Sequence, residues 1–230
     1  MNSERILEIL YRYTPMLLEG LENTIILTLA SFAIGFTLGL LIASGRVYGP
    51  RLLRSALTVY VEVVRGTPML LQLFLIYYAL PGVGVVLNPV EAAIIGMGLN
   101  SAAYQSEYIR SSIKAVPAGQ WEAALSLGMT RWQVITSIIL PLALRSSIPP
   151  LTNELVYLLQ YSSIAYFLTV VELVYAGKII GAETFAYLEV YTIIAVIYLA
   201  LSLIITRSMR YLEKKASVPG LLTPLASAPT

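Results

Sequence analysis

The chain has 230 residues, of which 57% are hydrophobic and only 12% are charged. Soluble domains carry about 25% charged residues, so this composition predicts a membrane protein. The formal net charge of +2 is too small to indicate binding to nucleic acid. Histidine and cysteine are both absent, which excludes the usual zinc sites, disulfides, thiol nucleophiles and Ser-His-Asp triads.

The first residues, 1–19, are expected to form an anchor at the membrane interface. Their apolar side chains recur at helical spacing opposite charged ones, and Pro15 is expected to break the helix. Residues 23–45 carry no charge and are long enough for a first span. Gly35 and Gly39 within it have GxxxG spacing, which favours close helix packing within the protomer over a dimerisation motif.

A second span is expected over residues 57–80, although charged residues and a proline interrupt it. Arg65 is costly at the bilayer centre, so it should lie near the cytoplasmic end or face protein and water. Pro68 frees a backbone carbonyl and should kink the span. The pair Asn88-Pro89 is expected to begin the next helix.

The third predicted span, residues 90–110, carries polar residues at regular spacing. They follow i, i+4, i+7 and i+11 positions, namely Asn100, Tyr104, Glu107 and Ser111. Such a stripe in a membrane helix must face a cavity or a partner helix. A hydrogen-bonded seam between helices and a substrate path are both consistent with it.

Two further spans of 17 uncharged residues each are predicted over 155–171 and 190–206. The first of them also has a polar face, formed by Asn153, Glu154, Tyr157, Gln160, Tyr161, Ser162 and Ser163. The segment 214–230 is rich in Pro, Ser and Ala towards its end and is expected to be a disordered tail.

The one long polar interruption lies between the third and fourth spans. A helix over 118–127 is expected to end at Gly128, and Thr130 with Gln133 matches a capping box that begins a second helix. The first helix carries Glu122 followed by two alanines, whose small side chains permit close approach of another surface. We therefore expect a docking element here.

Five predicted spans place the two termini on opposite sides of the membrane. One set of loops contains eleven Lys and Arg residues and the other contains three. Cytoplasmic loops carry the excess of positive charge. The N-terminus is therefore expected outside, and the C-terminus and loop 111–148 in the cytoplasm.

Motifs throughout the chain resemble those of ABC-importer permease subunits. One stretch of the chain resembles the EAA loop of that family: Glu122-Ala123-Ala124 with Gly128 and Ile138-x-Leu140-Pro141. Further motifs resemble those of the polar amino acid branch of the family, of the histidine and glutamine type. They are Arg65-Gly66-Thr67-Pro68, Asn100-Ser101-Ala102-Ala103-Tyr104 with Glu107 and Arg110, Pro117-x-Gly119-Gln120, Pro149-Pro150 with Asn153, and Glu172-Leu173.

The resemblance implies an all-α fold of the type I ABC importer permease, with five transmembrane helices and a cytoplasmic coupling helix. It implies a second permease, identical or related, two ATP-binding subunits that hold ATP and Mg, and an extracytoplasmic amino-acid-binding protein. The chain itself lacks GxxxxGK[ST], so ATP hydrolysis is expected on a separate chain. The residues implied in ATPase coupling are Gln120, Glu122, Ala123, Ala124, Gly128 and Met129.

Some residues of the loop and of the motifs are expected to have local or structural roles. Glu122 could instead cap its helix or pair locally, for example with Arg131. Trp121 and Trp132 are expected to brace the loop at the interface and not to touch ATP. The residues with a structural role in the motifs are Arg65, Gly66, Pro68 and Pro141.

The expected substrate path is lined by Asn100, Tyr104, Glu107, Asn153, Glu154, Tyr157, Gln160, Tyr161 and Ser162. Relatives often have Lys-Asp-Thr-Ser in the fourth span, where this chain has Gln160-Tyr161-Ser162-Ser163. The loss of the charged pair leaves open a neutral or apolar amino acid, or a site contributed mostly by the partner permease.

Other classes of function agree less well with the sequence. A self-contained secondary transporter or channel would show an internal repeat and dedicated ion ligands, and no clear repeat is present. A membrane-embedded enzyme is disfavoured by the missing His and Cys and the lack of an Asp pair.

Overall fold

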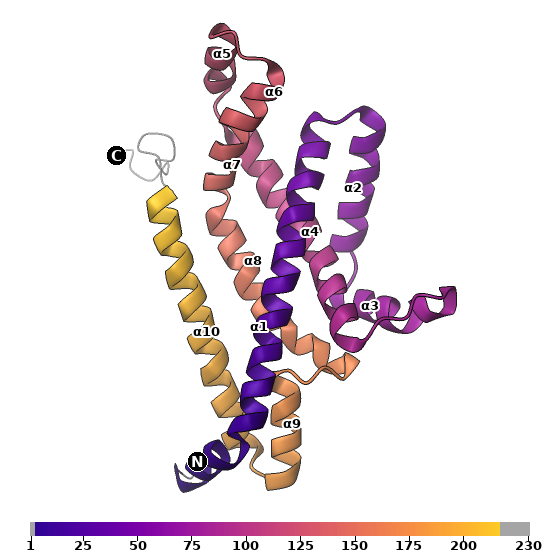
Figure 1. The fold of residues 1–230 in the computed structure, drawn as a ribbon, viewed down its shortest axis with the longest axis vertical. Helices are drawn as coiled ribbons and strands as arrows, with labels where there is room; N and C mark the ends of the chain where they lie inside the picture. Colours follow the sequence, from indigo (N-terminus) through magenta and orange to yellow (C-terminus); the bar gives the residue numbers. More distant parts are fainter. Residues whose placement is uncertain (1–2, 217–230) are drawn as a thin grey trace, which may run out of the picture.

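The computed structural model describes residues 3–216, and its regular secondary structure in that range is entirely helical, with no strand (Figure 1). Residues 217–230, most of the predicted tail, lie outside the described part. The helices are α1 Ser3–Tyr48, α2 Arg51–Arg65, α3 Met69–Phe74, η1 Leu75–Ala79, η2 Leu80–Val83, α4 Pro89–Ala115, α5 Ala118–Ser126, α6 Arg131–Val134, η3 Ile135–Ile139, α7 Leu140–Ser146, α8 Ile148–Tyr161, η4 Ser162–Leu168, α9 Leu173–Thr184 and α10 Tyr187–Ala216.

Helix α1 runs for 46 residues and contains Pro15 in its interior, so the expected break at this proline is wrong. Figure 1 shows instead that the first turns lie at an angle to the remainder. Tyr13 and Leu17 pack with residues of α9 and α10 on both sides of the proline. This burial offsets the lost backbone hydrogen bond and carries the helix into the first span.

By length and composition, α1 and α10 can each cross a membrane. Two further spans would be bent pairs of helices, Arg51–Arg65 with Met69–Val83 and Arg131–Ser146 with Ile148–Leu168. Helix α4, where the third span is predicted, is not sufficiently apolar for this criterion. It packs against α1, α2, α3, α7 and α8, so much of its surface meets protein and needs no apolar covering. The count of five spans stays a prediction.

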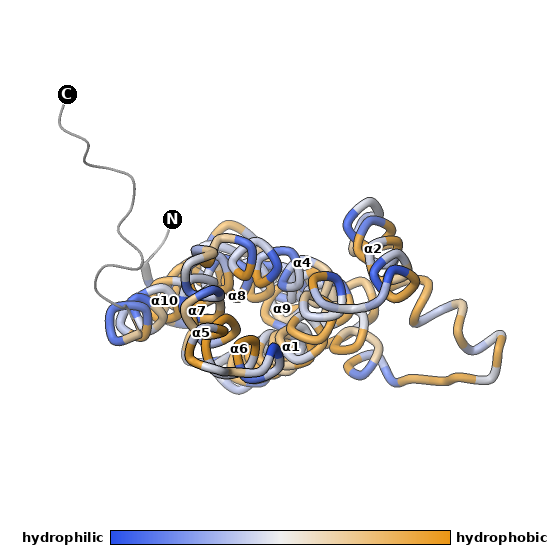
Figure 2. The backbone as a smooth tube through the Cα atoms, turned by 90° about the horizontal axis from the view of Figure 1, so that it is seen from above, coloured by the Kyte–Doolittle hydropathy of each residue, from blue (hydrophilic) through white to orange (hydrophobic). Residues whose placement is uncertain are grey.

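The predicted second span bends by 105° at the expected place. Gly66 ends α2, and Pro68 precedes α3 in an extended conformation, so the span is broken instead of kinked. The Gln72 side chain donates hydrogen bonds to the carbonyls of Val64, at 2.7 Å, and Thr67, at 3.1 Å, which stabilises the corner. Figure 2 shows the mainly hydrophobic segment after α3 extending away from the helical bundle.

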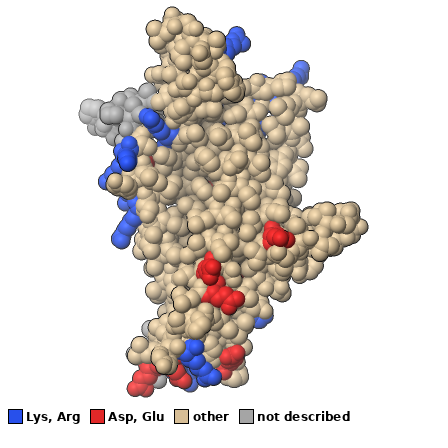
Figure 3. All heavy atoms as spheres, viewed as in Figure 1, with Lys and Arg blue, Asp and Glu red and all other residues tan. Residues whose placement is uncertain are grey.

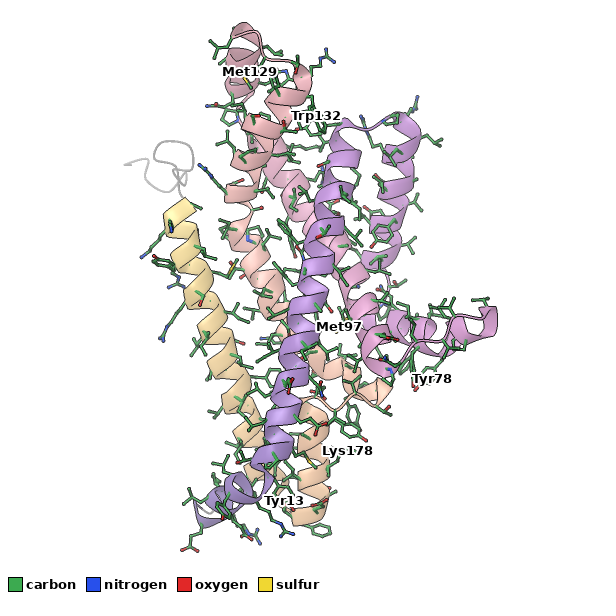
Figure 4. All side chains as sticks on the ribbon, viewed as in Figure 1. Tyr13, Tyr78, Met97, Met129, Trp132 and Lys178 are labelled. Carbon is green, nitrogen blue, oxygen red and sulfur yellow. The ribbon has the colours of Figure 1, made fainter. Side chains whose placement is uncertain are left out.

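The two glycines of the GxxxG pattern pack against α4 of the same protomer, as predicted. A Cβ atom on Gly35 would lie 2.6 Å from Nε2 of Gln105, and one on Gly39 would lie 3.1 Å from the backbone nitrogen of Ser106. Glycine at both positions therefore allows α1 and α4 to approach closely. Met97 of α4, labelled in Figure 4, is fully buried.

The stretch between the last two predicted spans contains a further helix, α9. The carboxylate of Glu172 caps it by accepting hydrogen bonds from the backbone nitrogens of Val174, at 2.7 Å, and Tyr175, at 2.8 Å. At the other end of the chain, α10 extends through Ala216, so residues 214–216 of the predicted tail are helical.

Candidate functional site

A cavity of about 410 Å³ lies where the corner between α2 and α3 meets α4 and α8. Its walls combine one carboxylate, one amide, a threonine, four tyrosines and several apolar side chains. The lining residues are Thr67, Pro68, Met69, Leu70, Asn100, Tyr104, Tyr108, Glu154, Tyr157, Tyr161 and Ile164.

Glu154 is the only ionisable carboxylate in the lining, which includes no Lys or Arg. Its side chain is 5% exposed. Ser101 donates a hydrogen bond of 2.6 Å to its Oε1 atom. A buried carboxylate is costly without a cation nearby, and none of the lining residues supplies one.

The corner of the broken span is fixed to the cavity wall. Asn100 on α4 donates a hydrogen bond of 3.0 Å to the side-chain oxygen of Gln72 on α3. Arg65, at the end of α2, stacks its guanidinium over the Tyr104 ring at 5.2 Å from the centroid. Both contacts connect the corner to α4 beside the cavity.

Five of the nine residues expected in the substrate path line this cavity, and four do not. The five are Asn100, Tyr104, Glu154, Tyr157 and Tyr161. Asn153 and Gln160 are exposed on α8 without contributing to the lining. Ser162 is buried, and its hydroxyl donates to the carbonyl of Leu159 at 2.7 Å.

Glu107 does not line the cavity, and its carboxylate is engaged with two arginines. It forms salt bridges with Arg46 of α1 and with Arg110, the latter at 2.5 Å. Glu107 follows Asn100 by seven residues, slightly less than two helical turns, so its side chain points partly away from the cavity face. Tyr108, eight residues after Asn100 and four after Tyr104, is the cavity residue that helical periodicity could have identified.

The predicted docking element forms one end of the molecule (Figure 1). Helix α5 ends in a Schellman arrangement, in which Gly128 N donates to Leu125 O at 2.9 Å and Met129 N to Ala124 O at 3.2 Å. Gly128 has φ +80°, which glycine adopts without strain. The capping box of Thr130 and Gln133 then starts α6, so both signals read from the sequence are confirmed.

The residues expected to couple to the ATPase face in two directions. Glu122 and Ala123 are exposed. Ala124 is buried against the protein itself, so only one of the two alanines is available to another surface. Gln120 and Met129 are partly exposed. Among the described residues Glu122 forms no ion pair, so the pairing with Arg131 is wrong.

The two tryptophans of this element also differ in their exposure. Trp121 packs against the cluster beneath the loop and braces it, as expected. Trp132 is 72% exposed and does not pack against this cluster, so its bracing role at the interface stays a prediction. Figure 4 shows Trp132 and Met129 near this end of the molecule. With Leu127, which is 83% exposed, Trp132 gives the tip an apolar surface typical of protein contacts.

Pro141 has a recognisable structural effect. The five residues Ile135–Ile139 before it form a π-helix, and Pro141 lies in the first turn of α7. A proline has no N–H to donate, so the preceding turn widens instead of continuing as a regular α-helix.

Apolar spans, an enclosed carboxylate between them and an exposed helix–turn–helix at one end define a membrane transport subunit. The family described as "Binding-protein-dependent transport system inner membrane component" matches residues 35–218. The chain belongs to this family and is the inner-membrane component of such a transport system.

Known proteins of this kind are similar over most of the chain. The probable amino-acid ABC transporter permease protein YckA of Bacillus subtilis (strain 168) is 41% identical, over 87% of this chain and 89% of that protein. The L-cystine transport system permease protein TcyB of the same organism is 40% identical, over 88% and 87%. A crystal structure of an amino acid ABC transporter with histidines is 36% identical, with a TM-score of 0.83, covering 90% of this chain and 96% of that one.

Proposed function

We propose that this permease imports an amino acid and that the cavity around Glu154 is part of its path. The observation that carries the proposal is the buried carboxylate at the cavity wall with no Lys or Arg in the lining. Every amino acid carries an ammonium group, which would supply the missing cation while it passes. The tyrosine rings around Glu154 add faces that attract cations.

The same lining restricts the substrate. Without a lining cation, a side-chain carboxylate would meet the Glu154 charge, so acidic amino acids are expected to be excluded. Tyr157 and Tyr161 remain 51% and 46% exposed beside the cavity. A second permease, identical or related, would cover them and complete the path.

ATP hydrolysis is assigned to two separate cytoplasmic subunits that bind ATP and Mg, and substrate delivery to an extracytoplasmic binding protein. The exposed tip of α5 and α6 is the surface that would dock on the ATP-binding subunits. Its apolar residues Leu127 and Trp132 and the rigid caps on both sides of Gly128 support this assignment. A capped element of this kind transmits motion as a lever.

Reconstitution in proteoliposomes tests the whole proposal. The permease, its ATPase and its binding protein are combined, and uptake of radiolabelled L-glutamine, L-histidine, L-arginine, L-cystine and L-glutamate is measured with and without ATP. We expect ATP-dependent uptake of at least one amino acid other than L-glutamate. Uptake by the permease alone would instead identify a secondary transporter or channel.

Variants test the two surfaces separately. Glu154→Gln should strongly reduce uptake, whereas Glu22→Gln, on the exposed surface of α1, should not. Leu127→Ala with Trp132→Ala should weaken association with the ATPase. Phe185→Ala is the matched control, because Phe185 is also 83% exposed but lies elsewhere, between α9 and α10. Equal loss of ATPase binding in the control would contradict docking at the tip.

The proposed orientation places the tip in the cytoplasm and the N-terminus outside. Figure 3 shows Lys and Arg near the end that carries α5 and along the end of α10, and in the opposite half acidic residues together with a further group of basic ones. Since the chain has no cysteine, single cysteines can report sidedness. An impermeant maleimide should label Tyr11→Cys in intact cells and Ser126→Cys only after permeabilisation.

A further inference from the structure

A column of buried polar groups runs from α1 to the cavity. Gln105 and Ser101, one helical turn apart on α4, are both fully buried. Gln105 Nε2 donates a hydrogen bond of 2.9 Å to Ser101 Oγ, and Ser101 Oγ donates one of 2.6 Å to Glu154 Oε1. The column therefore ends on the carboxylate that lines the cavity.

The direction of these bonds follows from the donor inventory. A serine hydroxyl has one proton, and here that proton points to Glu154. Ser101 can keep this direction because its lone pair receives the amide proton of Gln105. A hydrogen bond from a neutral donor to a carboxylate is among the stronger kinds, so it can fix the carboxylate geometry.

The position of Gln105 is itself set by α1. Its Nε2 also donates to the carbonyl of Phe32 at 3.3 Å. A Cβ atom on Gly35 would lie 2.6 Å from the same nitrogen, so the amide fits only because this residue is glycine. The Gln105 Oε1 atom is buried and has no hydrogen-bond partner among the described residues. The amide is thus held with its donor side toward Ser101, although this leaves an acceptor unused.

We propose that Ser101 and Gln105 are positioning residues, which aim the Glu154 carboxylate into the cavity and set its affinity for the ammonium group of the substrate. Neither residue lines the cavity, so both act through Glu154. Their role depends on the proposed function of Glu154 in the substrate path. A purely structural role would affect folding of the α1, α4 and α8 junction without a selective effect on binding.

The test measures the binding of a radiolabelled amino acid to the purified complex of permease and ATPase. L-glutamine, L-histidine, L-arginine and L-cystine are each tested separately. Ser101→Ala and Gln105→Met should each weaken binding of the transported amino acid, Ser101→Ala by roughly tenfold. Ser106→Ala is the matched control. Ser106 is equally buried on the same helix, but its hydroxyl donates to the Ala103 carbonyl at 2.8 Å. It should leave binding within about twofold of the wild type.

The decisive measurement repeats Ser101→Ala and Gln105→Met in a Glu154→Gln background. If both residues act through Glu154, they should add less than about twofold to the loss caused by Glu154→Gln. Full additivity, or an equal loss in Ser106→Ala, would overturn the positioning role. If Glu154→Gln alone left binding unchanged, the proposed substrate role of Glu154 would fail. A loss with Glu154→Gln but none with Ser101→Ala would overturn only the positioning role.

Discussion

Glu107 on α4 forms a salt bridge with Arg46 on α1 and a second one with Arg110. The Arg46 and Glu107 side chains are only 8% and 15% exposed. Arg46 also donates a hydrogen bond of 3.2 Å to Thr58 on α2, so one cluster connects three helices. The arrangement implies that the cluster holds the ends of α1, α2 and α4 together.

Replacement of Glu107 by Met should be strongly destabilising, because it leaves two arginines without their shared carboxylate. Breaking a buried pair costs about 3–5 kcal/mol. Arg46→Met should cost less, because Glu107 keeps Arg110 as a partner. Thermal unfolding of the purified permease would measure this order. An Arg46→Met variant less stable than Glu107→Met would contradict it.

The contact between Gly39 and α4 gives a second prediction. A Cβ atom on Gly39 would lie 3.1 Å from a backbone nitrogen and 3.2 Å from a backbone oxygen of α4, and neither can move aside as a flexible side chain would. Gly39→Ala should therefore lower the melting temperature. Gly119→Ala is the control, since nothing lies within 4 Å of the added Cβ, and alanine favours helix. A similar loss in both variants would show that the effect is not due to close packing.

The sequence predicts most strongly those features that depend on neighbouring residues. The helix start at Asn88-Pro89, the capping box at Thr130 and the helix end at Gly128 depend on residues close together in the chain, and the structure confirms them. The membrane location follows equally well from composition. The GxxxG contact was also anticipated, because small residues at that spacing form a flat surface on one helix face.

The sequence does not determine which side of a polar helix meets which neighbour. Glu107 lies within the polar stripe, yet it turns to Arg46, whose position depends on how α1 packs. Pro68 marks the corner, but the 105° bend depends on contacts of α3 with α4. Trp132 and Trp121 flank the same turn, yet Trp132 faces outward whereas Trp121 packs against the protein. Each of these outcomes depends on tertiary packing.

The turn between α5 and α6 provides a third prediction. Gly128 has φ +80°, a conformation that costs an L-residue about 1–2 kcal/mol. Gly128→Ala should loosen this turn and reduce amino-acid-stimulated ATP hydrolysis in the reconstituted complex. The cavity is remote from the turn along the chain, so binding of the amino acid should be unchanged. Gly119→Ala, in the same helix without positive φ, should keep normal stimulation. Reduced binding in Gly128→Ala would contradict a role confined to coupling.

Glu172 provides a prediction for the pH dependence of stability. It lies outside the predicted spans, at the start of α9, and burial raises the pKa of its carboxyl from 4.5 to about 7. Hydrogen bonds from the backbone of Val174 and Tyr175 and from Tyr198 act in the opposite direction but do not outweigh the loss of solvation. The folded protein therefore binds this proton more tightly than the unfolded chain does.

It follows that the contribution of protonated Glu172 to stability is complete below about pH 4.5 and is lost as pH rises through about 7. Between about pH 6 and about pH 8 the loss should amount to about 1 kcal/mol. Glu172→Gln keeps an acceptor for the α9 cap but cannot ionise, so it should remove this part of the pH dependence. Glu91→Gln, which replaces an exposed carboxylate in the first turn of α4, is the control. Chemical denaturation at the two pH values measures the free energy of unfolding of both variants. Only Glu172→Gln removes the buried carboxyl, so an unchanged pH dependence in this variant would show that another group titrates.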